Sequence, residues 1–102
     1  MVNIVNLTPH AITVCGRVIE SSGLARCESF AKEVGTIDGI KVNRRVYGDV
    51  TGLPEPVENT VYIVARYVAE AVSGKRNDIY VVDETVRDAD GRIIGCQALA
   101  VI

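Results

Sequence analysis

The sequence predicts an α+β fold built mostly from antiparallel β-hairpins, with one principal helix over residues 65–73. Apolar residues make up 48% of the 102-residue chain but aromatics only 5%, so the core must consist mainly of Val, Ile, Leu and Ala. The β-branched members of that set favour strands. Two Asp-Gly pairs between apolar runs, at 38–39 and 90–91, are typical of tight hairpins. One stretch of helix formers, from Ala65 to the glycine at 74, interrupts the β-like pattern.

Short strands are expected in the first part of the chain. Residues 3–7 form the first, and Thr-Pro-His at 8–10 ends it because proline fixes φ and restricts the preceding residue. Strands are expected at 11–15 and 17–21, where apolar residues keep an alternating pattern on both sides of Gly16, and a turn follows at 21–23. Residues 24–34 are β-like with weak alternation. Asp-Gly at 38–39 then turns the chain into a strand over 41–47.

A stiff loop is predicted from Tyr47 to Pro56, with two glycines and two prolines in ten residues. The segment after it is ambiguous, because apolar positions between 61 and 72 fit a helical stripe while residues 60–64 are rich in β formers. Helix formers begin only at Ala65, so we expect a buried strand over 60–64 and a helix over 65–73. Gly74 would end that helix.

In the last quarter of the chain, the residue pattern predicts a polar loop at 75–78 and strands at 79–82, 85–88 and 92–100, with a turn at 89–91. The length suits a single domain over residues 1–102. A domain of this size has a modest core, and association with further copies is a common supplement. We therefore expect a homo-oligomer.

Composition excludes several partners and sites. The net charge of −2 argues against binding DNA or RNA polymers, although a small phosphorylated ligand needs only two or three cations. Three widely spaced cysteines and one histidine predict no metal site and three reduced thiols, as in a reducing cytosol. No signal peptide, transmembrane run or lipidation motif is recognisable, so we expect no membrane attachment.

Catalysis has little support in the sequence. His10 is the only histidine and sits beside a turn, where a local hydrogen-bonding role is the simpler reading. No cysteine has a context that would activate a thiolate, and the paired carboxylates lie at predicted turns. No phosphate-binding glycine motif is present. We predict a binding protein with no catalytic residue and no cofactor.

Two polar clusters are the first candidate ligand contacts. Arg44 and Arg45 are neighbours on a strand, so they point to opposite faces and only one can serve a given site. With Tyr47, one of them could frame a phosphate and an aromatic ring, or both could be solvent-facing charges. The second cluster offers a cation, an amide and a carboxylate that could bind a base edge or ribose hydroxyls, or form a polar turn: Arg76, Asn77 and Asp78.

Two single residues complete the candidates. Arg92 follows a tight turn, where it could reach a phosphate or pair with a neighbouring Asp. Tyr67 lies on the predicted helix, where its ring could stack on a base or belong to the core.

The order of short motifs along nearly the whole chain resembles a group of small phage and prophage proteins. These motifs are Asn-Leu-Thr-Pro-His at 6–10, Tyr-Gly at 47–48 with Gly-Leu-Pro-Glu-Pro at 52–56, Tyr-Ile-Val at 62–64, Arg-Asn-Asp at 76–78, and Val-Arg-Asp at 86–88 with Gly-Arg-Ile-Ile-Gly-Cys at 91–96. Within this group the chain is similar to the first type of Thoeris anti-defence protein.

The resemblance implies a non-enzymatic sponge in the cytoplasm of the infected bacterial host. Such proteins bind glycocyclic ADP-ribose-type signals made by bacterial TIR-domain enzymes, hold them intact, bind cyclic oligonucleotides at a separate arginine-lined site, and assemble as dimers and hexamers. It implies that Tyr67 and Asn77 belong to the ADP-ribose pocket and that Arg44 or Arg45, with Arg92, contact phosphates.

The sequence leaves two other function classes open. A structural or accessory phage protein would act through protein contacts alone and would tolerate changes at Asn77 and Arg92. A small hydrolase would degrade the nucleotide signal rather than hold it.

Overall fold

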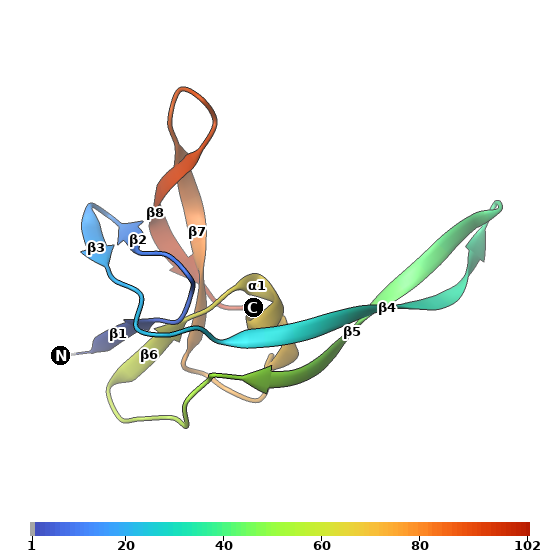
Figure 1. Cartoon of the computed structure of the whole chain (residues 1–102), viewed down its shortest axis with the longest axis horizontal. Coiled ribbons are helices and arrows are strands. Elements are labelled where there is room, and N and C mark those ends of the chain that lie inside the picture. Colours follow the sequence, from blue (N-terminus) through green and yellow to red (C-terminus); the bar gives the residue numbers. More distant parts are fainter. Residues whose placement is uncertain (1) are drawn as a thin grey trace.

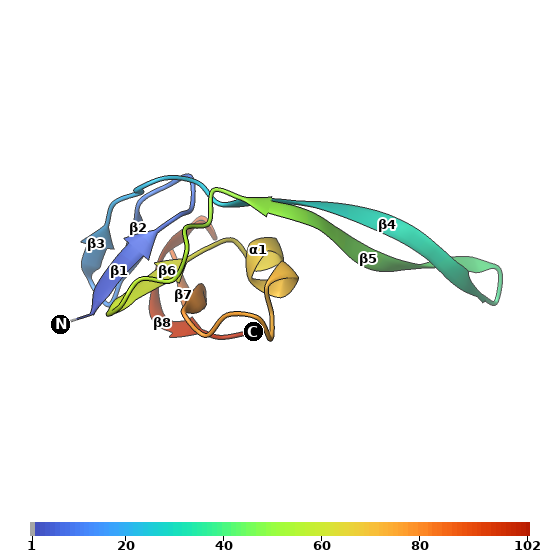
Figure 2. The same ribbon diagram turned by 90° about the horizontal axis from the view of Figure 1, so that it is seen from below.

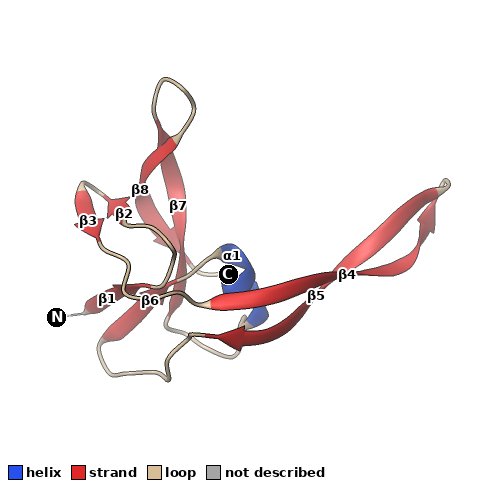
Figure 3. Ribbon diagram, in the orientation of Figure 1, coloured by secondary structure: helices blue, strands red, loops and turns tan. Residues whose placement is uncertain are grey.

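The computed structural model describes residues 2–102, which contain eight strands and one helix (Figures 1 and 3). In chain order they are β1 (Asn3–Asn6), β2 (Ile12–Val14), β3 (Arg17–Ile19), β4 (Arg26–Ile37), β5 (Ile40–Thr51), β6 (Thr60–Ile63), α1 (Arg66–Ala71), β7 (Ile79–Arg87) and β8 (Ile93–Ala100). The predicted α+β class and its antiparallel hairpins are confirmed in outline.

Six of the strands form one sheet in the order β1-β6-β7-β8-β2-β3. Two of its neighbours are the expected hairpins, β2–β3 and β7–β8. Three pairings are parallel instead: β1 with β6, β6 with β7, and β2 with β8. Strand alternation in the sequence does not distinguish these pairings from antiparallel ones, because both directions give the same period of two.

The two edges of this sheet meet at Asn6. The side chain of Asn6 is fully buried and its Nδ2 donates to the carbonyl oxygens of His10 (2.8 Å) and Ile19 (3.0 Å). Its Oδ1 accepts from the backbone N–H (2.9 Å) and the hydroxyl (2.6 Å) of Thr8. The backbone of Asn6 also forms a parallel bridge with Ser21, two residues after the end of β3. The first strand is therefore joined to the last strand of the sheet, and the sheet curls back on itself.

The core lies on both sides of β6. Tyr62 and Val64 belong to a cluster with Val68 and Ala69 of α1, and Leu7, Ala25, Ile79 and Val81 complete that cluster. Ile63, between Tyr62 and Val64, is fully buried on the opposite face, because successive strand residues alternate. The helix, the first residues of β4 and the last residues of β5 thus cover one face of the sheet, and the curl encloses the other.

The β4–β5 hairpin projects far beyond this body as an arm (Figures 1 and 2). Its two strands pair along 12 residues each, and every residue from 30 to 37 is exposed. The radius of gyration is 15.9 Å, compared with about 13 Å for a compact chain of this length. At the tip, Asp38 (φ 50°) and Gly39 (φ 80°) form the predicted two-residue turn. We call residues 26–51 the arm and residues 30–46 the outer arm.

The loop predicted from Tyr47 to Pro56 is wrong in its first half, because β5 continues to Thr51. An irregularity in the pairing next to Gly48 keeps Val50 opposite Cys27, where both pack against the core. The strand ends at Gly52, which has φ +80° and approaches the carbonyl of Leu24 so closely that a Cβ would lie 2.2 Å from its oxygen. Only glycine fits this position.

The helix predicted over residues 65–73 is shorter, at Arg66–Ala71. Val72 leaves helical geometry (φ −105°, ψ 9°), and the N–H of Ser73 bonds to the carbonyl of Glu70, which tightens the last turn. Gly74 adopts φ +78° just beyond this end.

The two strands predicted at 79–82 and 85–88 are one strand, β7, in which Glu84 has φ 48°. No helix among residues 2–102 has the length and apolar character that crossing a membrane requires.

Asn6→Asp should destabilise the fold strongly. The substitution keeps the shape but removes both N–H donors and places a carboxylate against the carbonyl oxygens of His10 and Ile19. We expect a loss of about 2–4 kcal/mol in the free energy of unfolding, measured with urea at neutral pH. The matched control is Asn43→Asp on the exposed outer arm, which should change stability by less than about 0.5 kcal/mol. Equal stabilities for the two variants would contradict this role of Asn6.

Candidate functional site

Two tyrosines form an aromatic platform where α1 meets the arm. Tyr67 projects from the first turn of α1 and stays 47% exposed. Tyr47 on β5 is half-buried, and its ring centroid lies 6.1 Å from that of Tyr67 with the planes inclined at 54°. Tilted rings at this separation attract each other. The pair therefore presents the face or edge of Tyr67 to solvent from a fixed position.

Glu70 fixes the ring of Tyr47 in this platform. The hydroxyl of Tyr47 donates a hydrogen bond to Oε2 of Glu70, and Nε of Arg66 donates to Oε1 at 3.0 Å. The bond from Tyr47 holds the pKa of Glu70 below its ordinary value, and the same bond raises the pKa of Tyr47. Arg45 lies near enough to oppose the rise at Tyr47. Two cations, one carboxylate and two rings thus gather at this point.

An open hollow of about 690 Å³ lies beside Tyr67, between α1 and the base of the arm. Its charged lining residues are Arg26, Glu28 and Asp49, all exposed. The remaining lining residues are small or apolar: Pro9, Leu24, Ala25, Cys27, Thr51, Ala65 and Val68. The volume falls in the range that small-molecule sites occupy. This hollow, with the platform of Tyr67 and Tyr47, is the candidate site.

Arg44 is separated from this site by the strand itself. Arg45 and Tyr47 are two residues apart and share a face of the arm, whereas Arg44 lies on the other face with Val46. Lys32 is opposite Arg44 in the pairing, so both cations lie on that other face. The two arginines thus lie on opposite faces of the arm, as neighbouring strand residues are expected to, and Arg45 is the one on the side of the platform.

Arg76, Asn77 and Asp78 lie together but away from the platform. Nε and Nη2 of Arg76 donate to the two carboxylate oxygens of Asp78 at 2.9 and 2.8 Å, and the two side chains are only 16% and 11% exposed. The guanidinium holds the pKa of Asp78 below its usual range, while the carboxylate raises the pKa of Arg76. Each charge is thus satisfied by the other, and the ion pair anchors the start of β7.

Asn77 is exposed beside this ion pair. It lines a smaller hollow of about 250 Å³ with Arg76, Val72, Val101 and other residues at the end of α1. The two hollows share no lining residue. Tyr67 lines the first hollow and Asn77 the second, so neither of these two hollows holds both side chains.

Arg92 lies at a third place, just before β8 in the turn of the β7–β8 hairpin (Figure 1). Its backbone N–H donates to Oδ1 of Asp88 at 3.0 Å, and the side chain is exposed. Figure 1 shows this hairpin and the arm leaving the body in different directions. The eight predicted contact residues therefore occupy four places. Tyr47, Tyr67 and Arg45 come together at the platform, while Arg44 lies on the other face of the arm, residues 76–78 lie together beyond the end of α1, and Arg92 lies at the β7–β8 turn.

Two contributors to the site were not predicted. Glu70 is four residues after Arg66 and three after Tyr67, the spacing that puts side chains on one helix face, so the helix alone could have indicated it. Arg26 gave no local signal, because its place in the hollow depends on how the arm leaves the body.

Burial raises the pKa of the Cys96 thiol, so this sulfur stays protonated at neutral pH. Residues 2–102 hold no group of three His, Cys, Asp or Glu side chains suited to a metal ion.

No protein-family model, curated protein or solved structure matches the chain.

Tyr47→Phe should raise the pKa of Glu70 toward 4.5, the ordinary value, because the hydroxyl bond is the main cause of its depression. A carboxyl whose pKa is lower in the folded state stabilises the fold above its unfolded pKa, and this contribution disappears as the pH falls through the folded pKa. The variant should therefore lose less stability than the wild type on acidification. Carbon-13 NMR titration of the Glu70 carboxyl reports the pKa directly. Tyr80→Phe is the control and should leave it unchanged, and an unchanged value in Tyr47→Phe would contradict the assignment.

Proposed function

We propose that this protein is a phage-encoded anti-defence protein that captures a cyclic ADP-ribose-type immune signal in the cytoplasm of the infected bacterial host and holds it without degrading it. The observation that carries the proposal is the half-exposed ring of Tyr67, fixed by Tyr47 on the wall of a hollow of about 690 Å³. The motif order along the chain adds the resemblance to the first type of Thoeris anti-defence protein.

Each part of such a ligand has a partner at this site. An adenine ring can stack on Tyr67, since every base offers a π-face to an aromatic side chain. Arg45 on the arm and Arg26 in the hollow supply the charges that a diphosphate requires. Glu28 and Asp49 line the same hollow and can accept hydrogen bonds from ribose hydroxyls.

Capture without chemistry fits the groups at this site. A sponge needs affinity and slow release, and neither requires a nucleophile or a general base. Cyclic oligonucleotides are the second ligand class that we propose. Arg44 lies on the other face of the arm and Arg92 at the β7–β8 turn, so neither belongs to the platform and each is a candidate contact for that second class.

Tyr67→Leu should weaken binding of a cyclic ADP-ribose isomer by about 5- to 150-fold, which corresponds to the roughly 1–3 kcal/mol that base stacking on an aromatic ring contributes. Leucine keeps apolar bulk but removes the π-face. Phe30→Leu, the same loss of a ring on the exposed outer arm, is the control and should bind like the wild type. The measurement is isothermal titration calorimetry against several isomers, followed by recovery of the ligand from denatured protein.

Three outcomes decide between the function classes. Binding with intact ligand recovered supports the sponge. Recovery of a hydrolysed ligand identifies a small hydrolase. No heat with any isomer at high ligand excess removes nucleotide capture and leaves a structural or accessory phage protein acting through protein contacts, the class that the exposed arm favours.

A further inference from the structure

The outer arm has one apolar face that nothing in the same chain covers. Phe30 and Val46 are opposite each other in the pairing, and Ile37 and Ile40 flank the turn at the tip. Their exposed fractions are 53%, 40%, 68% and 69%. Large apolar side chains scattered over a surface are ordinary, but a row of them along a projecting hairpin marks an interaction surface.

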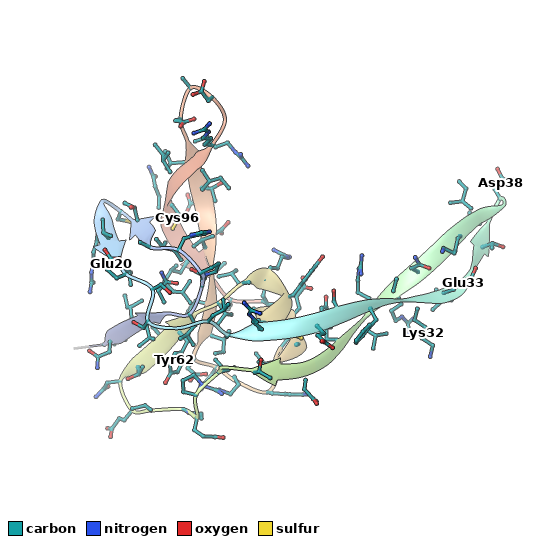
Figure 4. The ribbon with its side chains drawn as sticks, in the orientation of Figure 1. Glu20, Lys32, Glu33, Asp38, Tyr62 and Cys96 are labelled. Carbon is teal, nitrogen blue, oxygen red and sulfur yellow. The ribbon has the colours of Figure 1, made fainter. Side chains whose placement is uncertain are left out.

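The backbone of the outer arm also has no third strand from residues 2–102 beside it. Beyond the body, β4 and β5 pair only with each other, so each strand has an open edge of N–H and C=O groups. An isolated two-stranded hairpin is marginally stable in water, and long apolar edges promote association. The side chains of Lys32, Glu33 and Asp38 point away from the arm into solvent (Figure 4). The arm therefore has the features of a segment that becomes ordered against a partner.

Charge indicates what the partner is. Residues 30–46 carry four cations and two carboxylates, a net charge of +2, whereas the whole chain is −2, so the remainder carries −4. Two of the four cations, Lys32 and Arg44, lie opposite each other on the apolar face. Two arms facing each other would bring these four cations together, which opposes an arm-to-arm contact. A basic, apolar arm fits an acidic, apolar surface.

The β7–β8 hairpin of another copy is such a surface. Ile93 and Ile94 are each 56% exposed, and Val82 is 38% exposed. All three border a hollow of about 390 Å³ whose lining is mainly apolar. Residues 83–92 carry four carboxylates and two arginines, a net charge of −2. The arm of the same chain leaves the body in another direction and does not cover this surface (Figure 1).

We propose that the outer arm docks on the β7–β8 face of a second copy of this chain, and that the two copies exchange arms. Phe30 and Val46 cover Ile93, Ile94 and the hollow beside them, while Lys32 and Arg44 face the carboxylates of the β7–β8 hairpin. Reciprocal exchange uses both arms and both receiving faces, so the assembly closes as a dimer. The contact requires no nucleotide, so it stands or falls independently of the proposed ligand capture.

A charge-reversal experiment in the absence of any nucleotide tests this contact. Wild-type chain at about 100 µM should have twice the monomer mass of 11.0 kDa by light scattering after size exclusion. Reversing the arm charges (Lys32→Glu with Arg44→Glu), or those of the receiving hairpin (Asp83→Lys with Asp90→Lys), should weaken dimerisation on the order of 100-fold, because like charges then meet. An equal mixture of the two double variants should restore the double mass, since each arm again meets the opposite charge.

The control reverses two exposed carboxylates elsewhere, Glu55→Lys with Glu58→Lys, and should keep the wild-type mass. Circular dichroism of every variant establishes that it is folded. A wild type that is monomeric at this concentration overturns the proposal, as does an Asp83→Lys, Asp90→Lys variant that stays dimeric, which would indicate arm-to-arm contact. Tight binding of a labelled DNA duplex by a monomeric wild type, lost on reversing the arm charges, would instead assign the arm to nucleic acid.

Discussion

The side-chain amide of Asn6 is the contact on which the rest of the body depends. It is fully buried, and each of its hydrogen-bonding positions is filled by the Thr8–His10 turn or by the end of β3. A buried amide is costly unless all of its partners are in place. Its position between the two edge strands therefore makes closure of the sheet all-or-none, with Ile63 fully buried on the enclosed face.

Closure of the sheet leaves its other face to hold α1 and the base of the arm. Six residues are too few for an independently stable helix, so α1 depends on Val68 and Ala69 packed against β6 and β7. That packing turns Tyr67 outward, where Tyr47 and Glu70 fix the platform. At its base the arm packs against the core through Cys27 and Val50. Beyond that point it has neither a core nor a third strand, and its apolar face remains open for a second copy.

Local residue preferences predicted most of the strands and turns. The features that they did not predict depend on contacts between residues far apart in the sequence. Asp38 and Gly39 form the expected turn because both tolerate positive φ, and residues 60–63 form a strand because β formers precede Ala65. The end of β5 was misplaced because Val50 is held by Cys27 across the arm, a contact invisible in the sequence around it. The candidate site was predicted only in part, again because its members are brought together by contacts between distant segments. Tyr47 and Tyr67 meet, whereas Arg76 and Asp78 satisfy each other and Arg92 lies at another tip.

Amide hydrogen exchange along β4 and β5, measured at low and at high protein concentration, tests most directly whether the arm needs a second copy. Residues 27–29 and 47–50 should be protected at both concentrations, because Cys27 and Val50 fix this part of the arm against the core. Amides that pair across the arm between residues 31 and 45 should exchange rapidly in dilute protein and become protected as concentration rises. Equal protection of the outer arm at both concentrations, whether strong or absent, would contradict the account.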